Sequence, residues 1–223
     1  MSTSTRSYRR HLRAAEAHLS AASPVFAAVI AQAGPCTLTP NPDVFRVLVG
    51  SLISQFISTA AAKAIQARLE ARLKGNVTPR RLLNLTDDDL KACGISGAKA
   101  KSIRGVAEQF ARSRRFADEL AAADDLAVRA LLLPLYGVGP WTVDMLLIFC
   151  LARTDVWPVG DFAVRAGVRD LFGFDQMPGP TEMEAVAEPW RPYRSVAAWY
   201  LWRSRGFVPQ SGLEVEAAPD ANP

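Results

Sequence analysis

The chain has 223 residues, 49% of them hydrophobic, and a formal net charge of +4. This length suits one large or two small domains with a buried core. The longest apolar run, Met145 to Ala152, is far too short for a transmembrane helix, and the polar, basic stretch from Ser2 to Arg13 lacks the apolar region of a secretory signal. We therefore expect a globular cytoplasmic protein.

Cysteine and histidine usage excludes the common metal centres. The three cysteines, Cys36, Cys93 and Cys150, are scattered and form no Cys-x-x-Cys pair. Neither a zinc ribbon nor an iron–sulfur cluster can be built from them. The two histidines, His11 and His18, have no other obvious ligands beside them. We expect no metal site made of side chains.

Charge is unevenly distributed along the chain. Residues 1–115 carry 18 Lys/Arg against 7 Asp/Glu, whereas residues 116–223 carry 8 against 15. A basic half is typical of a protein whose partner is an acidic polymer. A solvated helical surface explains the same charges, so composition leaves both interpretations open.

Helix-start and helix-stop residues divide the chain into about ten expected helices. The signals are proline or a capping Ser, Thr or Asp at the start, and glycine at the end. Apolar residues recur with a period near 3.6, no convincing pair of strands is found, and the fold class should be all-α. The expected helices include residues 7–22, 59–73, 98–112, 127–133, 140–151, 162–171, 181–188 and 193–205, and others start near 24, 43, 79 and 87.

A glycine turn stands out between two of these helices, at Gly137-Val138-Gly139 before Pro140. Glycine permits a positive φ and close approach of another backbone, and proline suits the first helical turn. The free N–H groups and the dipole of the next helix would then form an anion site. No strand precedes the turn and no Gly-Lys-Ser/Thr follows, which argues against a nucleotide loop. A plain helix–helix connection is the alternative.

Two aspartates stand in apolar surroundings after this turn. Asp161 follows 24 residues after Gly137, in Trp157-Pro158-Val159-Gly160-Asp161-Phe162. Its carboxylate can cap the helix that starts at Phe162, serve as a catalytic group, or do both. Asp144 interrupts an otherwise apolar helix, where it either pairs locally with an arginine or lines a cleft.

These segments together resemble a known family. Leu135-x-Gly137-Val138-Gly139-Pro140-Trp141-Thr142, followed by Val156-Trp157-Pro158-x-Gly160-Asp161, resembles the helix–hairpin–helix (HhH-GPD) DNA glycosylase superfamily, in its 3-methyladenine DNA glycosylase II (AlkA) family. Three further segments agree with it in order: residues 52–61, 85–100 and 190–202. The resemblance covers about residues 40–207, and the joint occurrence of four ordered motifs is specific.

The resemblance implies a two-lobed helical fold without the N-terminal β domain of some members, because only about forty residues precede the matching region. One lobe, residues 43–150, carries the wedge segment and the helix–hairpin–helix. The other, residues 1–42 with 151–208, carries the catalytic aspartate. The acidic tail, residues 209–223, is expected to be disordered.

The resemblance also implies a function: a monofunctional glycosylase of base excision repair. Such an enzyme flips an alkylated purine out of double-stranded DNA, hydrolyses its glycosidic bond and leaves an abasic site. Strand-cleaving relatives carry a lysine where this chain has Trp141. The matched positions give Asp161 as catalytic group; Trp141, Met145, Phe162 and Trp202 as base pocket; Phe56 with Gln55 as DNA wedge; and Gly137, Val138, Gly139, Lys99 and Lys101 as DNA-backbone contacts.

The expected partners are damaged double-stranded DNA and no membrane, with the protein acting as a nucleoid-associated monomer. No cofactor is expected, although hairpins of this family often hold a monovalent cation through turn carbonyls. Two alternatives stay open. One is a glycosylase for another lesion, such as hypoxanthine, uracil or an oxidised base, and the other is a non-catalytic helix–hairpin–helix protein that only binds DNA.

Overall fold

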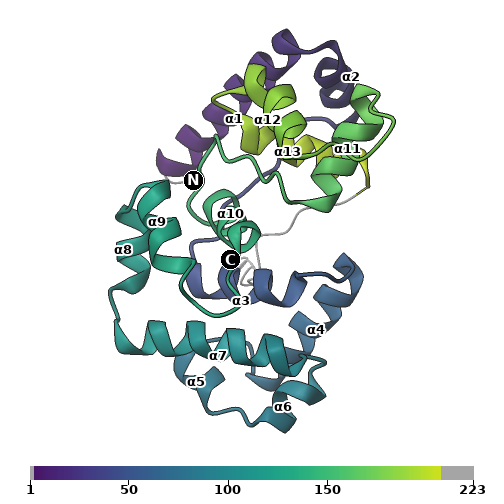
Figure 1. The fold of residues 1–223 in the computed structure, drawn as a ribbon. Helices are drawn as coiled ribbons and strands as arrows, with labels where there is room; N and C mark the ends of the chain where they lie inside the picture. Colours follow the sequence, from purple (N-terminus) through teal and green to yellow (C-terminus); the bar gives the residue numbers. More distant parts are fainter. Residues whose placement is uncertain (1–2, 207–223) are drawn as a thin grey trace, which may run out of the picture. The chain divides into compact units, whose positions relative to one another are not determined.

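The computed structural model describes residues 3–206, and all regular secondary structure in that range is helical (Figure 1). It contains thirteen α-helices and one 3-10 helix, which confirms the all-α prediction. One helix that the sequence did not predict, α8 (Phe116–Ala122), is a short segment between an arginine-rich and an aspartate-containing stretch. The acidic tail expected to be disordered lies outside the described residues.

The chain forms two compact units. Unit 1 contains residues 3–40 and 151–206, and unit 2 contains Asn41–Cys150. The helices of unit 1 are α1 (Thr3–Ala22), α2 (Pro24–Ala33), α11 (Phe162–Phe172), α12 (Pro180–Ala187), η1 (Glu188–Trp190) and α13 (Arg194–Ser204). Those of unit 2 are α3 (Val44–Ser54), α4 (Thr59–Arg72), α5 (Pro79–Leu83), α6 (Asp87–Ala92), α7 (Gly97–Arg112), α8, α9 (Asp125–Leu132) and α10 (Pro140–Phe149).

Unit 2 is built around two apolar helices. α3 packs against α10 and α7, and α9 packs against α10, while α5 and α6 lie along α7 (Figure 1). Every residue from Thr142 to Phe149 is buried, as expected of a helix that is apolar on nearly all faces. Because α3 and α10 pack against each other, the end of α3 and the start of α10 have fixed positions within unit 2.

Unit 1 joins helices from both ends of the chain. α13 packs against α1, α2 and α11, and every residue from Arg194 to Trp202 is buried. The close approach of α11 and α13 depends on Gly167, where a Cβ atom would lie 3.2 Å from the Cβ and the carbonyl oxygen of Leu201. These contacts place the start of α11 beside α13.

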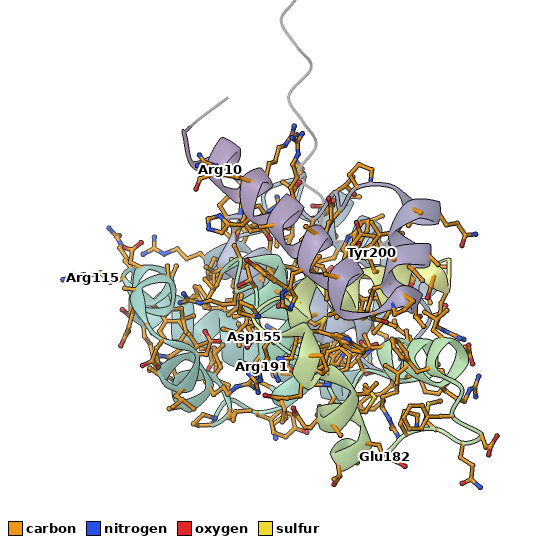
Figure 2. All side chains as sticks on the ribbon, turned by 90° about the horizontal axis from the view of Figure 1, so that it is seen from above. Arg10, Arg115, Asp155, Glu182, Arg191 and Tyr200 are labelled. Carbon is orange, nitrogen blue, oxygen red and sulfur yellow. The ribbon has the colours of Figure 1, made fainter. Side chains whose placement is uncertain are left out.

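Polar side chains fix the segment that leads to α11. Asp155 accepts hydrogen bonds from Arg194 Nε at 2.7 Å and Arg191 Nη1 at 2.8 Å, and Figure 2 shows Asp155 beside Arg191. Ser195 Oγ accepts from the Val156 N–H at 2.9 Å and donates to the Arg153 carbonyl at 2.7 Å. Buried hydrogen bonds to main chain of this kind restrict a loop that has no regular structure.

Side-chain caps explain where several helices begin. Ser58, Thr86, Ser96 and Asp124 each precede a helix and accept a hydrogen bond from the main-chain N–H three residues later. A cap of this type stabilises a helix by about 1 kcal/mol.

Among the described residues no helix is both long and apolar enough to cross a bilayer. No cluster of three or more metal-binding side chains occurs in the same range.

Candidate functional site

The turn between α9 and α10 requires glycine at its first position. Gly137 has φ 77°, and a Cβ atom there would lie 2.0 Å from Ser102 Oγ. Val138 is buried and anchors the turn, whereas a Cβ at Gly139 would meet open space. Gly139 precedes α10 and gives it no side-chain cap. The first N–H groups of α10 therefore receive no cap from the preceding side chain, which is the arrangement expected of an anion-binding helix start.

The end of α3 is tied to this turn by Gln55. Its Nε2 donates to the Gly137 carbonyl at 3.1 Å and to Thr142 Oγ1 at 2.7 Å. Thr142 is fully buried in the first turns of α10. The sequence placed Gln55 with the wedge, and the structure shows that its side chain also holds the glycine turn. Thr142, which was not predicted as a site residue, is the partner that makes this possible.

Phe56 lies at the tip of the connection between α3 and α4. Its side chain is 103% exposed, and its φ of 57° lies in the left-handed region. That region disfavours a non-glycine residue by about 1–2 kcal/mol, and an aromatic ring in full contact with water gains nothing from burial. The neighbouring Ile57 is also exposed. A chain that displays an aromatic ring in this way has the geometry that a DNA wedge needs.

The two lysines predicted to contact DNA differ in their surroundings. Lys99 Nζ donates to the carbonyls of Ile53 at 2.6 Å and Gln55 at 2.8 Å, and burial lowers the pKa of its ammonium. Lys101 is exposed, and its Nζ lies 4.2 Å from the ring centroid of Tyr136. Lys101 thus presents its charge at the surface beside the glycine turn, whereas the charge of Lys99 is directed toward main-chain oxygens.

Asp161 is the residue before α11 in unit 1, and it is only 7% exposed. Its Oδ1 accepts hydrogen bonds from the Val164 N–H at 2.8 Å and from the Trp202 indole Nε1 at 3.0 Å. The first bond is a helix cap, and the second comes from α13, 41 residues later in the chain. The carboxylate is therefore oriented by two elements, and its role as a cap is compatible with a chemical role.

The residues predicted for the base pocket fall in both units. In unit 1, the indole N–H of buried Trp202 binds Asp161, and Phe162, the next residue after Asp161, is 70% exposed. In unit 2, Trp141 is half-buried and Met145 is buried one turn later on α10. Phe162 therefore offers an open aromatic face in the immediate neighbourhood of the carboxylate.

Asp144 has a structural partner. This side chain of α10 is 5% exposed, and its Oδ1 lies 2.5 Å from Nη2 of Arg129 on α9. Of the two interpretations that the sequence left open, the structure shows the local ion pair with an arginine. The pair joins the two helices that flank the glycine turn.

Comparisons with known proteins agree with these features. An alkylbase DNA glycosidase-like protein of Schizosaccharomyces pombe is 31% identical over 195 residues, covering 85% of this chain and 92% of that protein. The structure of a 3-methyladenine DNA glycosylase from the same yeast, in complex with abasic DNA, matches with a TM-score of 0.76 and 28% identity, covering 86% of this chain and 97% of that one. A DNA-3-methyladenine glycosidase from Bacillus halodurans matches with a TM-score of 0.66 and 33% identity, covering 82% and 90%.

The family model for HhH-GPD superfamily base excision DNA repair proteins matches residues 49–192. This range holds Phe56, the glycine turn and Asp161, and it covers most of the described part of unit 2 together with residues 151–192 of unit 1. The resemblance noted in the sequence is thereby confirmed, together with the fold that it implies. The chain belongs to the HhH-GPD superfamily of base excision DNA repair proteins.

Proposed function

We propose that this chain is a monofunctional DNA glycosylase of base excision repair, which removes alkylated purines of the 3-methyladenine and 7-methylguanine type from double-stranded DNA. The observation that carries the proposal is the setting of Asp161, which is buried, caps α11 and is oriented by the Trp202 indole N–H. A protein that only binds DNA has no need of a carboxylate held in this way. The relatives named as alkylbase and 3-methyladenine glycosylases support the substrate class.

The proposed chemistry is hydrolysis of the bond between C1′ and the base nitrogen. As that bond breaks, its electron pair leaves with the base and positive charge develops on the sugar. A fixed carboxylate stabilises this charge electrostatically, and water then adds to C1′ and releases a proton. Methylated purines already carry positive charge and leave readily, so a strong general acid is not required. An electron-poor ring is also attracted to aromatic faces by about 0.5–2 kcal/mol, a role we assign to Phe162.

Unit 2 supplies the proposed DNA contacts. The N–H groups at the start of α10 and the ammonium of Lys101 suit phosphate oxygens. Phe56 would fill the gap left when the damaged base is flipped out, because an apolar side chain replaces lost stacking. Trp141 stands where strand-cleaving relatives have a lysine, so the product is an abasic site in an intact strand. We further propose that the protein acts as a monomer on nucleoid DNA.

A panel of duplexes that each contain one lesion tests the proposal. The lesions are 7-methylguanine, hypoxanthine, uracil and 8-oxoguanine, with 3-methyladenine release measured separately on methylated DNA. Excision is measured as alkali-dependent strand cleavage at saturating enzyme. We expect release of the methylated purines, and a loss of about 10³-fold in Asp161→Asn, the upper range for removal of one preorganised electrostatic group. Asn keeps the helix cap, so folding should be preserved.

Asp170→Asn is the matched control, since it removes one exposed carboxylate from the same helix. Its excision rate should stay within twofold of that of the parent protein. Release of hypoxanthine or uracil alone would show that the substrate class is wrong. Strand cleavage without alkali would contradict the monofunctional assignment. Full activity of Asp161→Asn would remove the basis for an enzyme that uses this carboxylate.

A further inference from the structure

The conformation of Phe56 depends on how the end of α3 is held. α3 ends at Ser54, the chain turns at Phe56 with φ 57°, and Ser58 caps α4. The last carbonyls of a helix have no partner inside that helix. A non-glycine residue in the left-handed region persists only where its surroundings impose that conformation. The groups that bind the carbonyls around Phe56 therefore decide whether its ring stays displayed.

Lys99 binds this segment from one side. It lies in the first turn of α7, and its Nζ donates to the carbonyls of Ile53 and Gln55, at 2.6 and 2.8 Å. These two carbonyls lie at the C-terminal end of α3, where a positive charge also complements the helix dipole. The second of them belongs to the residue immediately before Phe56. An ammonium group can donate three hydrogen bonds, and two of them fix this end of the turn.

Gln55 is also held from the other side. Its side-chain Nε2 donates to the Gly137 carbonyl and to Thr142 Oγ1. The main chain of Gln55 is thus tied to the start of α7, while its side chain is tied to the turn before α10. With both attachments in place, the residue before Phe56 has little freedom to rotate, and the strained turn cannot relax by moving α3 alone.

We propose that Lys99 is a positioning residue for the wedge, whose ammonium fixes the Ile53 and Gln55 carbonyls so that Phe56 is held ready to enter the DNA stack. The identity of Phe56 as a wedge rests on the proposed function. The clamp itself is a property of the free protein. Lys99 thereby acts on DNA through Phe56, whereas the exposed Lys101 would contact a phosphate group directly.

Hydrogen exchange in the free protein tests the clamp without DNA. Lys99→Met removes the ammonium but keeps a long side chain, and we expect amides in residues 52–58 to exchange at least tenfold faster. Lys99→Arg, whose guanidinium also donates several hydrogen bonds, should restore slow exchange. Lys91→Met is the matched control, because it removes an exposed positive charge from the neighbouring helix α6. Unchanged exchange in Lys99→Met would overturn the proposal.

The link to the wedge is tested on DNA with 2-aminopurine opposite a tetrahydrofuran abasic analogue. At saturating protein, the parent and Lys91→Met should produce the same fluorescence increase, and Lys99→Met and Phe56→Ala should each lose most of it. The double variant should lose no more than Phe56→Ala alone, because Lys99 acts through Phe56. Independent losses that add in the double variant contradict the proposal, as does a full signal in Phe56→Ala.

Two further arms keep the outcome interpretable. If Lys99→Met does not fold, Lys99→Ala replaces it, since it also lacks a donor for these carbonyls; we expect faster exchange and a reduced fluorescence increase, and parent-like values in both would overturn the clamp. A parent protein that gives the fluorescence increase but excises no base refutes the proposed function and leaves the wedge clamp supported. Loss of activity in Lys99→Met with parent-like exchange and fluorescence shows that Lys99 acts otherwise.

Discussion

Within residues 3–206 each unit buries one aspartate near a helix start, and different groups orient the two carboxylates. Asp144 of unit 2 is 5% exposed and forms an ion pair of 2.5 Å with Arg129. Asp161 of unit 1 is 7% exposed and accepts hydrogen bonds from two neutral groups, the Val164 N–H and the Trp202 indole. Burial is nearly the same in both cases. The two sites differ in that Arg129 binds the carboxylate of Asp144, whereas the Val164 N–H and the Trp202 indole orient the carboxylate of Asp161.

This contrast separates a structural acid from a candidate catalytic one. A buried ion pair contributes little net stability, because desolvation opposes the attraction, but losing one partner leaves an uncompensated charge. A carboxylate that the Val164 N–H and the Trp202 indole orient has a fixed position, from which its field can act on a developing cation. We therefore expect substitutions of Asp144 to affect folding and substitutions around Asp161 to affect catalysis.

The largest expected effect on stability is at Asp144. Asp144→Asn should lower the free energy of unfolding by about 2–4 kcal/mol, because Arg129 then lies partly buried without its charge partner. The double variant Asp144→Leu/Arg129→Met should recover most of this loss. Urea denaturation measures both. Excision per folded molecule should change less than threefold in Asp144→Asn, and a loss as large as that of Asp161→Asn would end the distinction between the two acids.

A smaller effect is expected when the indole donor to Asp161 is removed. Trp202→Phe keeps an aromatic ring but lacks the N–H, and a hydrogen bond to a charged group is worth about 1.5–3 kcal/mol. We expect single-turnover excision to fall about tenfold or more, with DNA affinity unchanged. Trp199→Phe is the control on the same helix, since its ring packs against Tyr200. Equal losses in the two variants would indicate a general packing defect in α13.

Local signals in the sequence predict most helix boundaries and part of the candidate site. Proline, glycine and capping residues mark most helix boundaries, and Asp161 is predicted both because it precedes a helix in an apolar segment and because it matches a family motif. The left-handed φ of Gly137 follows from glycine chemistry in the same way. Such features depend on neighbours a few residues away, so a single sequence carries them.

The partners of these residues could not be predicted, because they are distant in the chain. The bonds from Gln55 to Thr142, from Lys99 to Ile53 and from Trp202 to Asp161 join residues 87, 46 and 41 positions apart. The spacing of apolar residues along the sequence gives no information about contacts between residues so far apart. The resemblance to the family predicts that Lys99 contacts the DNA backbone, and only the fold shows that its ammonium binds two carbonyls.

The smallest effect separates the two roles of Asp161 itself. Asp161→Ser and Asp161→Ala both remove the acceptor of the Trp202 indole N–H, but Asp161→Ser keeps a side-chain oxygen that can accept from the Val164 N–H. The free energy of unfolding of Asp161→Ala should therefore be about 1 kcal/mol lower than that of Asp161→Ser. Both variants lack the carboxylate and should lose excision to the same extent. Thermal or urea unfolding beside single-turnover excision measures the pair. If activity followed stability, with Ser active and Ala inactive, the cap alone would explain the need for Asp161, and its difference from Asp144 would be one of helix position rather than of chemistry.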